Sequence, residues 1–99
     1  MQKNLTIAPK VRQLIKREVG RLMKPFGLTQ VEVFASEDQD NDPILVIEAA
    51  YELSKRPVDP ALITRLTAEL REKLWKLGER RFPHVHHRFA DGQKVVGYR

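Results

Sequence analysis

The sequence contains no cysteine, which excludes disulfide bonds, thiolate-bound metals and cysteine-based catalysis. It also lacks a long apolar run, since the longest, from Ile44 to Ile47, is far shorter than the roughly 20 residues that span a bilayer. Residues 1–10 lack the apolar segment of a signal peptide. We therefore expect a soluble cytoplasmic protein.

The motifs of several enzyme classes are missing as well. No serine has the flanking glycines of a nucleophile elbow, and neither Ser36 nor Ser54 has an evident base partner. The turns at Gly27 and Gly78 each hold a single glycine and match no phosphate-binding loop. We expect no catalytic residue and no cofactor, and a non-enzymatic protein is the better interpretation.

Basic residues are absent from the middle third of the chain. Residues 28–54 carry seven acidic and no basic side chains, whereas residues 1–27 carry seven basic and one acidic. Residues 55–99 carry eleven basic and five acidic side chains, so the net charge of +5 hides an acidic segment between two basic ones. Such segregation bears on association rather than on the fold. It indicates either binding through charge or an internal arrangement, in which the basic helices and the acidic hairpin attract each other or face solvent on separate sides.

Hydrophobic periodicity predicts one α+β domain over residues 1–99, with residues 1–8 and 91–99 as candidates for frayed ends. Two segments have apolar residues every three or four positions, and the second begins with Asp59 as N-cap followed by Pro60. The predicted order is a helix over 9–24, strands over 28–36 and 44–52, a helix over 60–77 and a strand over 84–90.

This order predicts a two-layer sandwich in which both helices pack on one face of a small sheet that contains an antiparallel hairpin. The packed face would be that of Val31 and Ile47. Two short additional strands are optional, Leu5 to Ile7 in front and Lys94 to Tyr98 after the Asp91-Gly92 turn.

Basic side chains cover the outer face of the first predicted helix and recur after the second. They could neutralise several phosphates, which makes RNA, DNA or an acidic protein the expected partner of a binding module. The aromatic octamer of an RNA-recognition motif and the Gly-x-x-Gly loop of a KH domain are both absent. The candidate residues are Lys10, Arg12, Lys16, Arg17, Arg21, Lys24, Arg80, Arg81 and Arg88.

The sheet face opposite the helices offers an alternative from another class. Phe34, Val46 and Glu48 would lie on this uncovered face and could form a partner interface. The protein would then be a dimerising or antitoxin-like accessory domain that makes no contact with nucleic acid. Binding that falls steeply with salt favours the first hypothesis, whereas an apolar interface barely responds.

The three histidines are adjacent in the sequence. In a strand, His84 and His86 share one face and could bind one zinc-like ion, with Glu32 or Glu48 of a neighbouring strand as a third ligand. His87 would point to the core side. We interpret the histidines as an exposed strand edge, with no metal, because two certain ligands do not make a tight site.

Trp75 lies about 100° away from the leucine stripe of the second predicted helix. A large aromatic residue in a small domain is usually mostly buried. We therefore expect Trp75 to pack beneath the last strand or the first helix rather than to be exposed as a binding anchor.

Two segments, RPVDP at residues 56–60 and LWKLGERRFPHVHH at residues 74–87, resemble small uncharacterised bacterial α+β proteins with no assigned activity. This resemblance covers roughly the second half of the chain. In element order, the chain also resembles the KH-like fold of ribosome-binding factor A, which implies a role on RNA. That fold has a kinked, glycine-containing helix pair where this chain has one continuous helix from Pro60 to Leu77.

Overall fold

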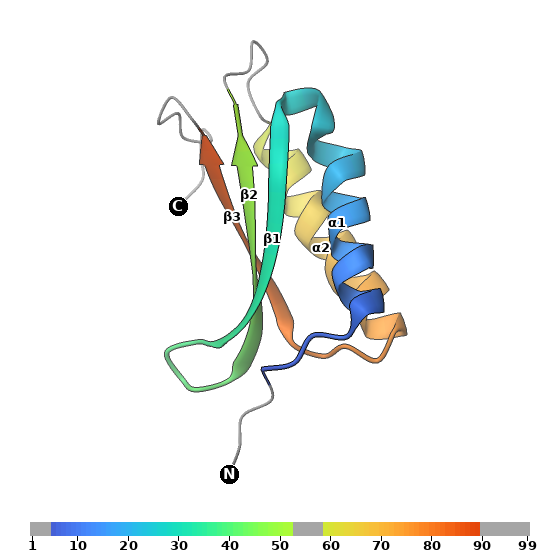
Figure 1. Cartoon of the computed structure of the whole chain (residues 1–99), viewed down its shortest axis with the longest axis vertical. Coiled ribbons are helices and arrows are strands. Elements are labelled where there is room, and N and C mark those ends of the chain that lie inside the picture. Colours follow the sequence, from blue (N-terminus) through green and yellow to red (C-terminus); the bar gives the residue numbers. More distant parts are fainter. Residues whose placement is uncertain (1–4, 53–58, 90–99) are drawn as a thin grey trace.

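A computed structural model describes residues 5–52 and 59–89 of the chain and confirms the α+β architecture (Figure 1). Each predicted helix and strand is present, in the predicted order, within one or two residues of its expected bounds. The elements are α1 (Pro9–Met23), a 3-10 turn η1 (Lys24–Phe26), β1 (Leu28–Glu37), β2 (Pro43–Tyr51), α2 (Pro60–Lys76) and β3 (Phe82–Phe89).

The three strands form one mixed sheet with β2 in the centre. β1 pairs with β2 as the predicted antiparallel hairpin, and β3 pairs with β2 in parallel. Both helices lie against the same face of the sheet, with α1 nearer β1 and α2 behind it (Figure 1). In this sheet, β1 and β3 are therefore edge strands, each with a helix beside it.

The core lies between the helices and the sheet. Alternate residues of β2, from Leu45 to Tyr51, point into it, and Ile47 is fully buried as predicted. Because the apolar positions of each helix recur every three or four residues, they form the stripes that cover this face. The helical contribution comes from Val11, Leu14, Ile15, Val19, Met23, Ile63, Leu66, Leu70 and Leu74.

The ends of the helices follow from local chemistry. Asp59 caps α2, since its Oδ1 accepts a hydrogen bond of 2.9 Å from the backbone N–H of Ala61. At the other end, Gly78 has a φ of +86°, and the N–H groups of Gly78 and Glu79 bond to the carbonyls of Trp75 and Leu74. This is a Schellman motif, which needs a left-handed residue and thus favours glycine.

Some expectations were wrong in detail. β3 begins at Phe82, two residues before the predicted start, because Pro83 is tolerated in an edge strand. Leu5 to Ile7 form no strand; Ile7 packs against the core and the carbonyl of Thr6 accepts a hydrogen bond from Arg81. The predicted strand over residues 94–98 lies outside the described residues. None of the helices in the described ranges has the length and apolar character needed to span a membrane.

Candidate nucleic-acid interface

An open hollow of about 650 Å³ lies between α1 and the edge strand β1. We call it the α1–β1 hollow. One wall is the outer face of α1, and the other is the first half of β1. It is lined by Lys16, Arg17, Gly20, Arg21, Lys24, Leu28, Thr29, Gln30 and Val31. Four of the nine basic residues expected at a nucleic-acid interface thus meet at one place.

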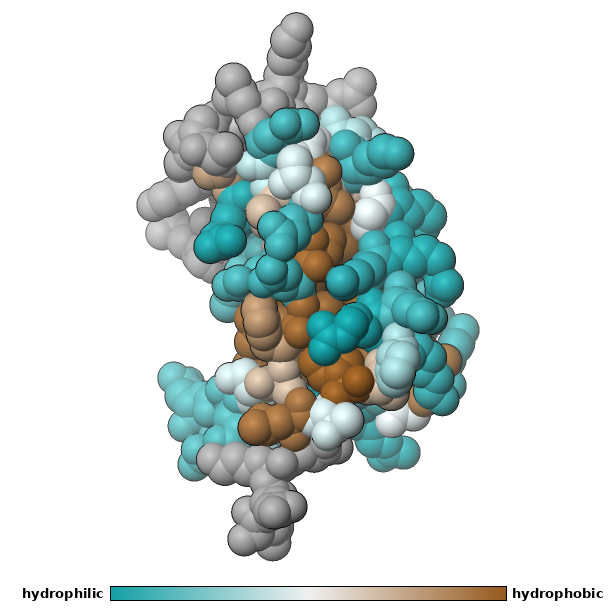
Figure 2. All heavy atoms as spheres, viewed as in Figure 1, coloured by the Kyte–Doolittle hydropathy of each residue, from teal (hydrophilic) through white to brown (hydrophobic). Residues whose placement is uncertain are grey.

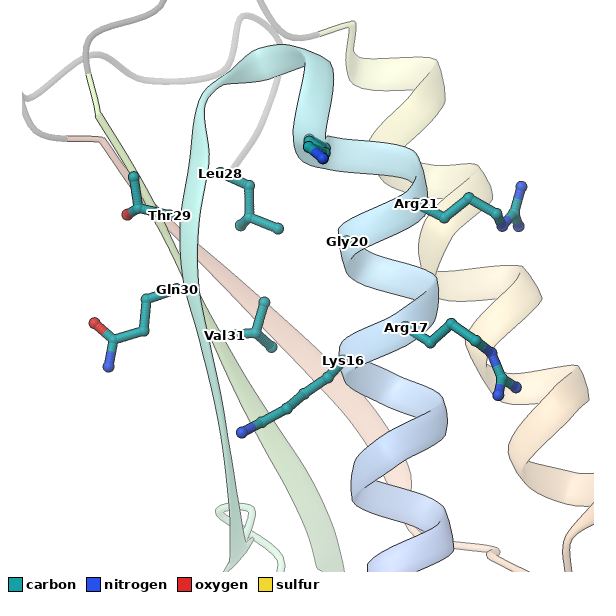
Figure 3. A pocket seen from close by; sticks show the side chains of 9 residues that line it. Lys16, Arg17, Gly20, Arg21, Leu28, Thr29, Gln30 and Val31 are labelled. Carbon is teal, nitrogen blue, oxygen red and sulfur yellow. The ribbon is translucent and has the colours of Figure 1, made fainter.

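The floor of the hollow is apolar. Leu28 and Val31 point from β1 toward the helix, whereas Thr29 and Gln30 lie on the other side of the strand (Figure 3). The register of β1 shifts between Leu28 and Gln30, which places Leu28 and Val31 on the helix side. Figure 2 shows the result as a strip of hydrophobic surface between β1 and α1, bordered by hydrophilic side chains.

The four basic side chains of the hollow differ in their freedom. Lys16 extends from α1 toward β1, whereas Arg17 and Arg21 extend to the opposite side of the helix (Figure 3). Lys16 and Lys24 form no ion pair with any residue of the described ranges. Arg17 is two-thirds exposed and lies 3.6 Å from Glu18. Two lysines therefore carry the charge available to the hollow, because Arg17 points away from β1 and lies beside Glu18.

Arg21 is exposed, but its guanidinium is held by two carboxylates. Its Nη2 donates to Glu18 at 2.8 Å and to Glu69 at 3.1 Å. Glu18 is only 4% exposed, and it also accepts a hydrogen bond from Lys73 Nζ at 2.5 Å. The hydrogen bonds from Lys73 and Arg21 lower the pKa of Glu18 to about 2, so this carboxylate stays ionised and links α1 to α2.

The acidic turn lies at the far end of the hairpin. Asp38 Oδ1 accepts hydrogen bonds of 2.9 Å from the backbone N–H groups of Asp40 and Asp42, which fixes the turn locally. From Val31 to Asp38 the strand rises about 3.3 Å per residue, or roughly 23 Å in all. This exceeds the Debye length of about 8 Å in physiological salt, so the turn barely weakens the field at Lys16.

The other predicted basic residues are dispersed. Arg12 Nη1 donates to the carbonyl of Val33 in β1 at 3.0 Å, and Lys10 is exposed in the first turn of α1. Arg81 pairs with Glu79 at 2.8 Å. Arg88 lies on the uncovered sheet face, in register with Ala50 of β2. Neither Arg80, Arg81 nor Arg88 lines the α1–β1 hollow.

The uncovered sheet face carries the residues proposed for a partner interface. Phe34, Val46 and His84 are in register across the three strands, and Phe34 is 45% exposed. The next row along the strands contains Glu32, Glu48 and His86. β3 therefore lies beside Glu48, as the metal hypothesis required. Even so, no group of three or more potential ligands in the described parts of the chain is arranged to hold a metal ion.

His87 points to the helix side, as predicted, and contacts the aromatic end of the core. A hydrogen bond of 2.6 Å joins its Nδ1 to the hydroxyl of Tyr51, whose ring also stacks on Phe89. Its Nε2 is buried without a hydrogen-bond partner in the described residues. Burial, together with the charge of His86, lowers the pKa of His87 to about 4, and burial raises that of Tyr51.

A second hollow, of about 430 Å³, lies beside the other edge strand. We call it the α2–β3 hollow, and it is lined by Pro60, Ile63, Thr64, Thr67, Ala68, Arg71 and Phe82. Near its end, Trp75 is 60% exposed, so the expectation that this residue packs in the core was wrong. The leucine stripe of α2 is sufficient to cover the sheet, and a residue about 100° away from that stripe faces solvent.

Sequence reasoning did not identify Gly20 or Arg71 as site residues. Gly20 lies on the side of α1 that faces β1 (Figure 3), and a Cβ at this position would meet no atom within 4 Å. A glycine in a helix interior is unfavourable by about 1 kcal/mol relative to alanine, which is a signal that the sequence did contain.

No protein-family model matches the chain, and no curated protein or solved structure matches it either.

Proposed function

We propose that this protein is a non-enzymatic module that binds single-stranded nucleic acid in the α1–β1 hollow. The observation that carries the proposal is that Lys16 and Lys24, neither of which pairs with a carboxylate of the described residues, line an open hollow with an apolar floor beside an edge strand. Cations beside an apolar surface suit a strand of nucleic acid, because phosphates need charge and unpaired bases need a surface to lie on.

In this arrangement the phosphates follow α1 and the bases face β1. Lys16 and Lys24 are two turns of helix apart, which is about 12 Å and matches roughly two nucleotides of an extended strand. The bases then contact Leu28 and Val31. Gly20 lies between the two lysines along the helix and lets the ligand approach the helix closely, because it presents no side chain.

The experiment measures fluorescence anisotropy of a labelled single-stranded oligonucleotide against protein, at salt concentrations from low to moderate. We expect the logarithm of affinity to fall linearly with the logarithm of salt, with a slope of about −0.7 for each phosphate contact. The double variant Lys16→Gln/Lys24→Gln should bind on the order of tenfold more weakly. Its slope should be less negative by about 1.4, since two phosphate contacts are lost.

A matched control carries the same charge change on α2. Arg65 and Lys76 are exposed and pair with Glu69 and Glu72 on their own helix. The variant Arg65→Gln/Lys76→Gln should therefore keep most of the affinity. Equal losses in both variants, or no binding at low salt, would rule out the hollow as the site. If the protein instead self-associates through Phe34 and is insensitive to salt, the accessory-domain hypothesis is the better account.

A further inference from the structure

Two arginines lie over two exposed aromatic rings where α2 leads into β3. The guanidinium of Arg80 is 4.7 Å from the ring centroid of Trp75, and that of Arg71 is 4.7 Å from the ring centroid of Phe82. Even so, Trp75 is 60% exposed and Phe82 is 38% exposed. Trp and Arg are among the residue types most enriched at the hot spots of binding sites.

The turn after α2 brings these groups together. Gly78, in its left-handed conformation, reverses the chain, and the bonds from Gly78 and Glu79 to the last turn of α2 hold it there. Arg80 is thereby returned over Trp75, one turn back along the helix. The position of Arg80 is thus set by hydrogen-bonded backbone rather than by a freely moving loop.

A small cavity of about 50 Å³ lies between the two rings and is lined by Arg71, Trp75, Glu79, Arg80, Arg81, Phe82 and Pro83. Its walls hold three guanidinium groups but one carboxylate, and that carboxylate is bound by Arg81 at 2.8 Å. Arg71 and Arg80 form no ion pair with the described residues. Since a cavity that holds a benzene ring has a volume of about 150 Å³, this one has room for a small anion and is too small for an aromatic ring.

We propose that this cluster is a second binding site, which takes a mononucleotide unit with its phosphate between Arg71 and Arg80 and its base on the exposed part of Trp75. The planar guanidinium forms paired hydrogen bonds with phosphate oxygens, and neither Arg71 nor Arg80 pairs with a carboxylate of the described residues. Any of the nucleic-acid bases can stack on an indole ring, so this contact does not select a particular base. The site is independent of the α1–β1 hollow, because no residue lines both.

Trp75 is the single tryptophan of the chain, so its fluorescence reports on this site directly. The experiment titrates the full chain with a nucleoside monophosphate, and separately with the corresponding nucleoside and with inorganic phosphate. We expect saturable quenching by the monophosphate and at least about tenfold weaker binding of either part alone. Arg71→Gln and Arg80→Gln should each weaken binding several-fold while the circular dichroism spectrum stays unchanged.

The variant Lys16→Gln/Lys24→Gln serves as the control, because it alters the α1–β1 hollow and leaves the tryptophan site intact. It should bind the monophosphate as the natural sequence does, whether or not the hollow binds oligonucleotides. The proposal is overturned if inorganic phosphate binds as tightly as the monophosphate, since the ring would then contribute nothing. It is also overturned if a glutamate-rich peptide quenches Trp75 and the monophosphate does not.

Discussion

The α1–β1 hollow and the α2–β3 hollow have the same construction, a helix laid beside an edge strand, but they differ in chemistry. The first has Lys16 and Lys24 on its helical wall, whereas the second has Thr64, Thr67 and Ala68 at its centre and a cation only at its end. The backbone thus places a groove beside each edge strand, but the two grooves differ in size, about 650 Å³ against 430 Å³, and in the charge of their helical walls.

The difference arises from how each helix handles its own charges. On α2, Arg65 pairs with Glu69 and Lys76 with Glu72, each four residues apart. On α1 the single acidic residue, Glu18, is buried and used by Arg21 and by Lys73 of α2. Glu18 also lies 3.6 Å from Arg17, whereas Lys10 and Lys16 of α1 pair with no carboxylate of the described residues, so their charge faces solvent.

The largest predicted effect concerns the β3 side, where His87 is half-buried and its Nε2 is fully buried. The pKa of His87 is about 6.5 in the unfolded chain and about 4 in the folded one, so the unfolded state binds the proton first as pH falls. Between pH 6.5 and 4.5 the free energy of unfolding should therefore drop by about 2–3 kcal/mol, at about 1.4 kcal/mol per pH unit. Urea denaturation at several pH values measures this.

Replacing His87 by phenylalanine should flatten that dependence. Glu18 does not interfere in this window, because its lowered pKa makes its stabilising contribution complete above pH 4.5 and lost only as the pH falls toward 2. A natural chain whose stability is constant from pH 7 to pH 5 would contradict a buried, neutral imidazole.

The next prediction moves charge from one hollow to the other. In the Lys16→Gln/Lys24→Gln background, adding Thr64→Lys and Thr67→Lys restores the net charge of the protein but places the two cations in the α2–β3 hollow. We expect oligonucleotide affinity to stay roughly tenfold below that of the natural chain, because attraction without a fitting groove gives only weak binding. Fluorescence anisotropy titrations measure this affinity. An affinity equal to that of the natural chain would show that net charge alone determines binding.

The smallest effect compares two positions in the middle of the helices. Gly20→Ala should raise the free energy of unfolding by about 0.5–1 kcal/mol and weaken oligonucleotide binding, since the new methyl group enters open space in the α1–β1 hollow. Ala68→Gly, in the α2–β3 hollow, should lower stability by a similar amount and leave binding unchanged. A Gly20→Ala variant that is more stable and binds normally would show that Gly20 serves no ligand.

The sequence predicted the elements well, because their signals are local. The Asp59-Pro60 start of α2 and the glycines that end η1 and α2 act within a few residues of their own positions. The start of β3 was placed too late, because proline in a strand is acceptable only at an edge or a first position, and the order of the strands is not a local property.

The candidate site was harder to predict, because residues distant in the sequence determine whether each charged side chain is paired or free. Periodicity placed Lys16 and Arg21 on one helix. It could not show that Arg21 is used by Glu18 and Glu69 while Lys16 is free, since Lys73 and Glu69 reach Glu18 and Arg21 from about 50 residues away. The exposure of Trp75 likewise depends on how much of the sheet the leucines of α2 already cover.

The parallel pairing of β3 with β2 has a consequence for the order of folding. The hairpin joins residues close in sequence, such as Glu37 and Pro43, whereas Ile44 must find Phe82 after the whole of α2 has intervened. Closing long loops costs more entropy and slows folding, so the hairpin and α1 can assemble early while β3 docks late. The turn that carries Arg80 and precedes β3 is then among the last parts of the molecule to reach its native position. The fluorescence of Trp75, beside this turn, reports when that step takes place.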